Sequence, residues 1–200
     1  MYKVCKRIFD ILASLITIVM LSWLFIIIAI WILIDSRGGI FYKQIRVGKD
    51  GKEFNLLKFR SMRTGADKSG QLTIGSDSRV TSVGRFIRKF KIDEFPQLIN
   101  ILKGEMSIVG PRPEVPKYVA MYSADQRKVL SVLPGLTDYA SLEYLDEQKV
   151  LGASADPEKT YVEEVMPKKL DLNLKYISER SLILDVKLIF KTIYGVFGKK

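Results

Sequence analysis

The stretch that decides the fold runs from Ile11 to Ile34 and reads ILASLITIVMLSWLFIIIAIWILI. It carries no charge over 24 residues, so a straight helix through it would span about 36 Å. A bilayer core is about 30 Å thick, and a helix that is apolar on every face has no side to turn toward water. A cleaved signal peptide would have a shorter apolar region. We therefore predict a membrane-embedded segment and assign residues 1–36 to a membrane-anchoring unit.

Basic residues flank this segment on both sides: Lys3, Lys6 and Arg7 before it, and Arg37, Lys43 and Arg46 after it. The positive-inside rule therefore draws both ends toward the cytoplasm. Two arrangements remain open, a re-entrant helix that bends and returns, or an ordinary span whose side is set by the larger domain. The segment has no proline, and Ser22 is the candidate for a bend because its hydroxyl can bond back to a carbonyl.

Residues 37–200 are predicted to form a second unit, a small domain with interfacial helices, and the whole chain is predicted to be α+β and mainly helical. The sequence GKDGKE, residues 48–53, is typical of a turn between two short strands. Arg79–Lys91 has helical apolar spacing with basic residues around it, which is typical of an interfacial amphipathic helix. A second helix is predicted from Asp93 to Leu102, ended by Gly104, and another over Tyr118–Val132. The stretch LPGLTDYASLEY, residues 133–144, is predicted to be a loop. The C-terminal apolar spacing predicts a helix on the membrane or in the core: Leu182, Val186, Ile189, Ile193 and Val196.

Composition restricts the chemistry. The formal net charge is +10, from 32 Lys and Arg against 22 Asp and Glu, which suits anionic partners such as phospholipids and nucleotides. There is no histidine, so a Ser-His-Asp triad and imidazole metal ligands are excluded. The single cysteine, Cys5, excludes an internal disulfide and a multi-cysteine zinc site. Catalysis therefore has to use carboxylates, Arg, Lys or hydroxyl groups.

Adjacent Asp93 and Glu94 follow the basic stretch RFIRKFK, residues 85–91. Acidic residues at the start of a helix often only complement its dipole. The alternative is that one carboxylate is a nucleophile and the other holds a metal or tunes its partner, since carboxylates form covalent phosphoryl intermediates and hard cations prefer oxygen.

Three basic residues are candidates for binding phosphate. Arg112 lies between Pro111 and Pro113, so its backbone is stiff and its guanidinium is well placed for a phosphate fork. Lys58 and Arg60 alternate with apolar residues, so both charges should share one face of a strand. A structural loop and a solvated strand face are the competing interpretations.

In five places the chain resembles the monotopic polyprenol-phosphate phosphoglycosyl transferases, which initiate bacterial surface-glycan pathways. The similar stretches are KRIFDI (6–11), KFRSM (58–62), residues 84–114 with the block DEFPQLINILKGEMSIVGPRPE, LPGLTDYA (133–140), and the acidic and apolar C-terminal region from LDLNLKYI (170–177) onward. They follow the family's order along nearly the whole chain.

The resemblance implies transfer of a sugar 1-phosphate from a UDP-sugar to a polyprenol phosphate such as undecaprenyl phosphate. It implies that Asp93 attacks the donor, that Glu94 and Asp93 support Mg²⁺, and that Arg88 and Arg112 bind phosphate. It also implies a re-entrant helix in the inner membrane with the catalytic domain facing the cytoplasm. Two positions depart from the family pattern: Trp23 follows Ser22 where a proline is usual, and Asp138 stands where a glycine is usual. The second departure leaves the identity of the sugar open.

Two other functions are weighed against transfer. One is a membrane phosphohydrolase that cleaves a nucleotide sugar with water, and the other is a non-catalytic organiser of polysaccharide assembly. Nucleic acid is not an expected partner, because the charge is spread and no recognition motif appears. No Walker A or Rossmann glycine pattern is present either. The sequence makes no prediction of the oligomeric state.

Overall fold

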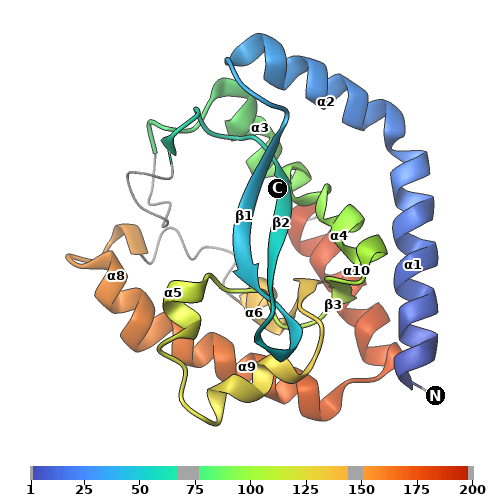
Figure 1. The fold of residues 1–200 in the computed structure, drawn as a ribbon, viewed down its shortest axis with the longest axis vertical. Helices are drawn as coiled ribbons and strands as arrows, with labels where there is room; N and C mark the ends of the chain where they lie inside the picture. Colours follow the sequence, from blue (N-terminus) through green and yellow to red (C-terminus); the bar gives the residue numbers. More distant parts are fainter. Residues whose placement is uncertain (1, 67–76, 144–150, 198–200) are drawn as a thin grey trace.

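The computed structural model describes residues 2–66, 77–143 and 151–197. Figure 1 shows helices around a central β-hairpin, with α1 along one side and α2 across one end. The prediction of a mainly helical α+β fold is confirmed. The helices and strands are α1 (Tyr2–Met20), α2 (Ser22–Asp35), β1 (Phe41–Val47), β2 (Glu53–Phe59), α3 (Ser82–Lys89), α4 (Gln97–Lys103), β3 (Ser107–Val109), α5 (Pro116–Val119), β4 (Gly135–Thr137), α6 (Tyr139–Glu143), α8 (Pro157–Thr160), α9 (Met166–Glu179) and α10 (Leu182–Phe197).

The apolar N-terminal segment is bent. In the described part of the chain no single helix is both long and apolar enough to cross a bilayer, whereas α1 and α2 together are, across a bend of 63°. The Ser22 hydroxyl donates to the carbonyl of Val19 at 2.9 Å, as the sequence suggested for this position. The bend therefore forms without proline. The hydroxyl of Ser22 bonds to a backbone carbonyl at the point where the helix changes direction.

The first three turns of α1 are joined to the globular domain by polar contacts. Arg7 donates to the carbonyls of Ile101 and Leu102 at the end of α4, at 2.7 and 3.1 Å. Asp10 is buried and accepts from the hydroxyl of Ser107 at 2.7 Å. Lys6 pairs with Asp185 of α10 at 2.8 Å. The start of the apolar helix pair is therefore held against the domain by side-chain contacts.

Large apolar side chains remain exposed on α1, α2 and α10. Examples are Val19, Met20, Trp23 and Ile34 on the helix pair, and Ile183, Phe190 and Tyr194 on α10. The predicted C-terminal helix is confirmed, and Leu188 on its other face is buried against Val109 and Tyr176. The exposed fractions of Ile34 and Ile183, 79% and 83%, are unusual for isolated surface side chains, and so many neighbouring exposed side chains mark an interaction surface.

The predicted hairpin is also confirmed. β1 pairs antiparallel with β2, from Phe41 opposite Phe59 to Val47 opposite Glu53, through a 3₁₀ turn over Lys49–Gly51. The predicted amphipathic helix is shorter than expected: α3 covers Ser82–Lys89, and its Phe86 contacts Trp31 of α2 with ring centroids 5.4 Å apart. Gly104 ends α4 in a left-handed conformation, as predicted.

Two local predictions were wrong. Residues 133–144 were expected to form a loop, but β4 pairs parallel with β3 and is followed by α6. The approach is very close, because a Cβ on Gly135 would lie 2.1 Å from the backbone nitrogen of Gly110. The continuous helix expected over Tyr118–Val132 is also absent, since α5 ends at Val119 and only a 3₁₀ helix covers Gln126–Ser131.

Candidate functional site

Asp93 and Glu94 lie on a 3₁₀ turn, Ile92–Glu94, between α3 and α4. The sequence placed them in the first turn of an α-helix, but that helix begins only at Gln97. Lys91 before the turn has a left-handed backbone with φ of 56°, a conformation common just after the end of a helix. Both carboxylates are buried, with exposed fractions of 7% and 8%. A short turn rather than a regular helix therefore presents two adjacent acids to the interior.

Two cations neutralise Glu94. Arg112 donates from one guanidinium nitrogen to Oε2 at 3.1 Å and from another to Oε1, and Lys58 donates to Oε1 at 3.2 Å. Burial by itself would raise the pKa of Glu94, but Arg112 and then Lys58 outweigh it and hold that pKa well below its usual range. Glu94 is therefore an anion that pairs with Arg112 and Lys58 and holds both side chains in place.

The surroundings of Asp93 differ from those of Glu94, and its pKa moves in the opposite direction. Within the described residues, no hydrogen-bond donor reaches its buried Oδ1. Burial raises the pKa of Asp93, and neighbouring Glu94 adds to that effect, while Lys58, Arg88 and Lys91 oppose it. Two adjacent carboxylates are thus pushed apart in pKa by their surroundings, which is typical of a functional pair. Asp93 therefore lines the cleft with a buried oxygen that no described donor occupies, whereas the Glu94 oxygens accept from Arg112 and Lys58.

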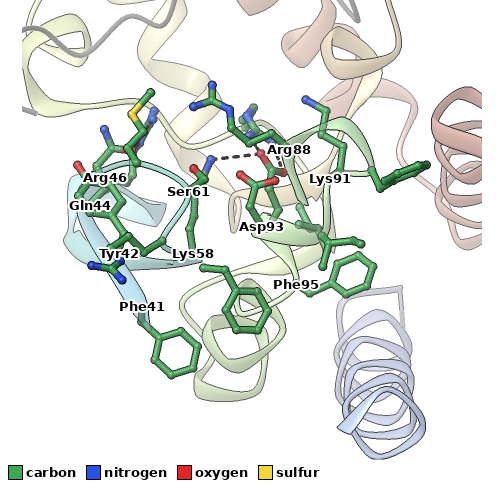
Figure 2. Close-up of a pocket in the computed structure, with 18 of the residues that line it drawn as sticks. Phe41, Tyr42, Gln44, Arg46, Lys58, Ser61, Arg88, Lys91, Asp93 and Phe95 are labelled. Carbon is green, nitrogen blue, oxygen red and sulfur yellow. Dashed lines mark hydrogen bonds and ion pairs between the residues drawn. The ribbon is translucent and has the colours of Figure 1, made fainter. Parts of the chain in front are cut away.

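The cleft around Asp93 and Glu94 is lined by basic residues and by apolar residues. It has a volume of about 2090 Å³, and it is lined near the carboxylates by Lys58, Arg88, Lys91 and Arg112. In Figure 2, Arg88 and Lys91 lie on one side of Asp93, while Phe41 and Phe95 lie on the other. Leu24 of α2 and Ile193 of α10 also line this cleft, so it reaches the helices that carry the exposed apolar surface. The site can therefore contact an anionic group and an apolar chain together.

Arg60 lines the same cleft as the other predicted phosphate ligands, but its guanidinium is bonded to backbone carbonyls. β2 ends at Phe59, and the buried Arg60 guanidinium donates to Ile32 and Ser36 carbonyls at 3.2 and 2.7 Å, and to the Arg37 carbonyl. Gly38 has φ of 129°, and a Cβ there would meet the guanidinium at 2.1 Å. Arg60 therefore caps the end of α2, because a cation there satisfies carbonyls that lack helical partners. Lys58, Arg88 and Arg112 do converge around the carboxylates.

Arg60→Ala is accordingly expected to destabilise the protein. At least about 1.5–3 kcal/mol of unfolding free energy should be lost, the value of one hydrogen bond from a charged group. Thermal unfolding in detergent measures this, with the exposed Arg63→Ala as the matched control. An Arg60→Ala protein as stable as the control would contradict the capping role.

Asp138 is a residue whose structural part the sequence did not reveal. It is fully buried, and its carboxylate accepts the backbone N–H of Arg112 at 3.2 Å and that of Ser141 at 2.7 Å. The signal in the sequence was the departure at this position from the glycine of the family pattern. Its contact with a residue 26 positions away required the parallel pairing of β3 and β4.

Asp93 and Glu94 differ in how well they suit Mg²⁺ as ligands. The described residues contain no group of three or more His, Cys, Asp or Glu side chains placed to hold a metal ion. Mg²⁺ is commonly bound by one or two carboxylates together with substrate phosphates and water. The free Oδ1 of Asp93 fits that chemistry, whereas Glu94, with Lys58 and Arg112 on its oxygens, does not present a free oxygen in this arrangement.

Known proteins are similar to this chain over nearly its whole length. Residues 1–199 match the family model described as bacterial sugar transferase. The chain is 39% identical over 198 residues to the UDP-N-acetylgalactosamine-undecaprenyl-phosphate N-acetylgalactosaminephosphotransferase of Aeromonas hydrophila, covering 96% of this chain and 43% of that protein. It is 37% identical over 196 residues to the undecaprenyl-phosphate glucose phosphotransferase of Komagataeibacter xylinus, covering 94% and 35%. It is 34% identical over 193 residues to the uncharacterized sugar transferase EpsL of Bacillus subtilis, covering 96% and 87%. The chain thus spans less than half the length of the first two relatives and most of the third.

Proposed function

Because the chain belongs to the bacterial sugar transferase family, we propose that it transfers a sugar 1-phosphate from a UDP-sugar to a polyprenol phosphate, such as undecaprenyl phosphate. The observation that carries this proposal is the free oxygen of Asp93 beside a Glu94 already neutralised by Arg112 and Lys58. A carboxylate needs no base to be a nucleophile, which suits a chain without histidine.

The proposed reaction has two balanced steps. An oxygen of Asp93 attacks the phosphorus that carries the sugar, a new O–P bond forms, and the bond to UMP breaks with its electron pair leaving on UMP. A phosphate oxygen of the lipid then attacks the same phosphorus, and the carboxylate of Asp93 leaves. Arg88, Arg112 and Lys58 face the diphosphate and balance its charge.

Mg²⁺ belongs to the same proposal. Of the two adjacent carboxylates, Asp93 is the one with an oxygen that no described donor occupies, and the remaining ligands would be donor phosphate oxygens and water. When bound, the ion would offset the repulsion between the attacking carboxylate and the phosphates. Glu94 acts through Arg112 and Lys58.

Product analysis tests the function against its alternatives. Detergent-solubilised protein is incubated with a panel of UDP-sugars, with and without undecaprenyl phosphate, and UMP and lipid products are measured. Transfer predicts UMP release that depends on the lipid, together with a new sugar-diphosphate lipid. UMP and sugar phosphate released at the same rate without lipid would identify a phosphohydrolase, and no release with any donor would favour an organiser of polysaccharide assembly.

We further propose that the α1–α2 pair is re-entrant in the inner membrane, with both ends on the cytoplasmic side. The start of α1 is bonded to α4 and α10, and the end of α2 is capped by Arg60 of the same domain. Two ends attached to one domain favour one side of the bilayer, and the exposed apolar side chains of α1, α2 and α10 suit its interior. The lipid substrate would then reach Asp93 without leaving the membrane.

Single-cysteine labelling tests this topology. Cysteines are placed at Lys3 and Lys43 in a Cys5-free protein, and Lys52 on the hairpin turn is the control for the domain side. We expect positions 3, 43 and 52 to react with an impermeant maleimide in inverted vesicles and to be protected in intact cells. Labelling of position 3 in intact cells, with 43 and 52 protected, would instead establish a full span.

A further inference from the structure

The loops that follow β3 and β4 are held together closely. Parallel strands end at the same edge of a sheet, so residues 111–114 and the segment beginning at Asp138 emerge side by side. Gly110 donates its N–H to the Thr137 carbonyl at 3.0 Å, and Gly135 donates to the Pro111 carbonyl at 2.9 Å. Glycine is needed at both strands because any side chain would strike the opposite backbone.

Arg112 has the one backbone donor in the Pro111–Arg112–Pro113 tripeptide, since proline has no N–H. That donor bonds to Oδ2 of Asp138 at 3.2 Å. The other carboxylate oxygen accepts from Ser141, which lies in α6, at 2.7 Å. Asp138 has an exposed fraction of 0%, so water does not replace either bond. A buried anion therefore fixes the backbone from which the Arg112 guanidinium extends to Glu94.

We propose that Asp138 is a positioning residue for Arg112 and thereby for binding of the donor diphosphate. The inference rests on the proposed function, because it takes the Arg112 guanidinium to bind the diphosphate. The carboxylate holds Arg112 by its single backbone donor, so the guanidinium keeps the orientation in which it meets Glu94. Asp138 itself has no contact with a reacting atom in this assignment.

The competing account gives Asp138 a local role, as the cap on the first turn of α6. Two substitutions separate the accounts. Asp138→Asn keeps the size of the side chain but has one acceptor oxygen for two N–H groups. Asp138→Ser is a good helix cap and can keep the Ser141 bond, but its shorter side chain cannot reach Arg112. A local cap therefore predicts that the serine variant behaves like the wild type.

A double-mutant cycle on binding of UDP, followed by calorimetry, provides the test. We expect Asp138→Asn and Asp138→Ser each to weaken UDP binding about tenfold in the wild-type background, by displacing one charge-assisted contact. In an Arg112→Ala background the same changes should weaken it less than about twofold, because residues that act through one another are not additive. Asp10→Asn is the matched control, since Asp10 is also a buried carboxylate that accepts a backbone N–H, from Ile108 at 3.1 Å.

Each outcome decides the proposal. Additive effects of Asp138 and Arg112, or UDP binding by the Asp138→Ser protein equal to that of the wild type, would overturn it. A wild-type protein that does not bind UDP would also overturn it. If UDP binds and the cycle is non-additive but no lipid-dependent UMP appears with any donor, the positioning role stands and only the transfer reaction fails. Should Asp138→Asn not fold, the serine variant alone completes the cycle.

Discussion

Asp93→Asn is expected to reduce sugar-phosphate transfer by about 10⁴-fold or more, the scale of removing a covalent nucleophile from an enzyme. The amide cannot attack phosphorus, yet it has nearly the shape of the carboxylate. The variant should fold without loss of thermal stability, because it removes a buried charge whose Oδ1 no donor reaches within the described chain and whose pKa burial raises. Donor binding should persist, since Arg88, Arg112 and Lys58 remain.

Intact-protein mass measurement identifies the intermediate directly. Wild-type protein incubated with donor and Mg²⁺, but without lipid, should gain the mass of one sugar phosphate and lose it when undecaprenyl phosphate is added. Asp93→Asn should gain nothing, while Asp35→Asn, in which the altered side chain lies at the end of α2, should behave like the wild type. Substantial transfer by Asp93→Asn, or kinetics that require both substrates to be bound together, would replace the covalent route with direct attack by the lipid phosphate.

Glu94→Gln is expected to lower kcat/KM for the donor by about 10²–10³-fold, since the charge-assisted hydrogen bonds that Glu94 accepts from Arg112 and Lys58 are worth about 1.5–3 kcal/mol each. The loss has a specific cause: partial burial lowers the pKa of Lys58, whose side chain is 19% exposed, while Glu94 opposes that change. Without the Glu94 charge Lys58 tends to lose its proton, and Arg112 loses its bidentate partner. The donor diphosphate would then meet a weaker and less ordered cationic wall.

Steady-state kinetics against both donor and Mg²⁺ separate this role from metal binding. The Mg²⁺ concentration that gives half the maximal rate should be nearly unchanged in Glu94→Gln, because Glu94 is assigned to the cations. A large increase in that concentration would show that Glu94 holds the metal, as the family resemblance implied. Glu105→Gln is the matched control, since Glu105 accepts a hydrogen bond from Asn100 at the end of α4.

The mixed cleft also gives a physical reason why one small domain could serve both substrates of the proposed transfer. The cationic residues near Asp93 suit the charged ends of the donor and the lipid, and the aromatic and aliphatic wall from β1, α2 and α10 suits a polyprenyl chain. Both kinds of surface meet at buried Asp93, so in the proposed reaction the second substrate reaches the same phosphorus after UMP has left.

The sequence by itself determined the features that depend on local pattern. A charge-free stretch of apolar residues predicts a membrane segment, Gly-rich turn chemistry predicts the β1–β2 hairpin, and Gly104 ends α4. Adjacent Asp93 and Glu94 could be proposed as a pair because residue type and order are visible in the chain, together with the family resemblance. Each of these signals lies within a few neighbouring residues, where helix and strand periodicity and turn preferences act.

Only the tertiary structure decided how these residues divide the chemistry. Lys58 and Arg60 look equivalent in sequence, yet one pairs with Glu94 while the other caps α2, because β2 ends between them at Phe59. Asp93 and Glu94 also look equivalent, yet Glu94 is neutralised by residues 36 and 18 positions away. Such contacts depend on how distant segments pack, which no local sequence pattern encodes. Burial then strengthens the effect of neighbouring charges on the pKa of each carboxyl group.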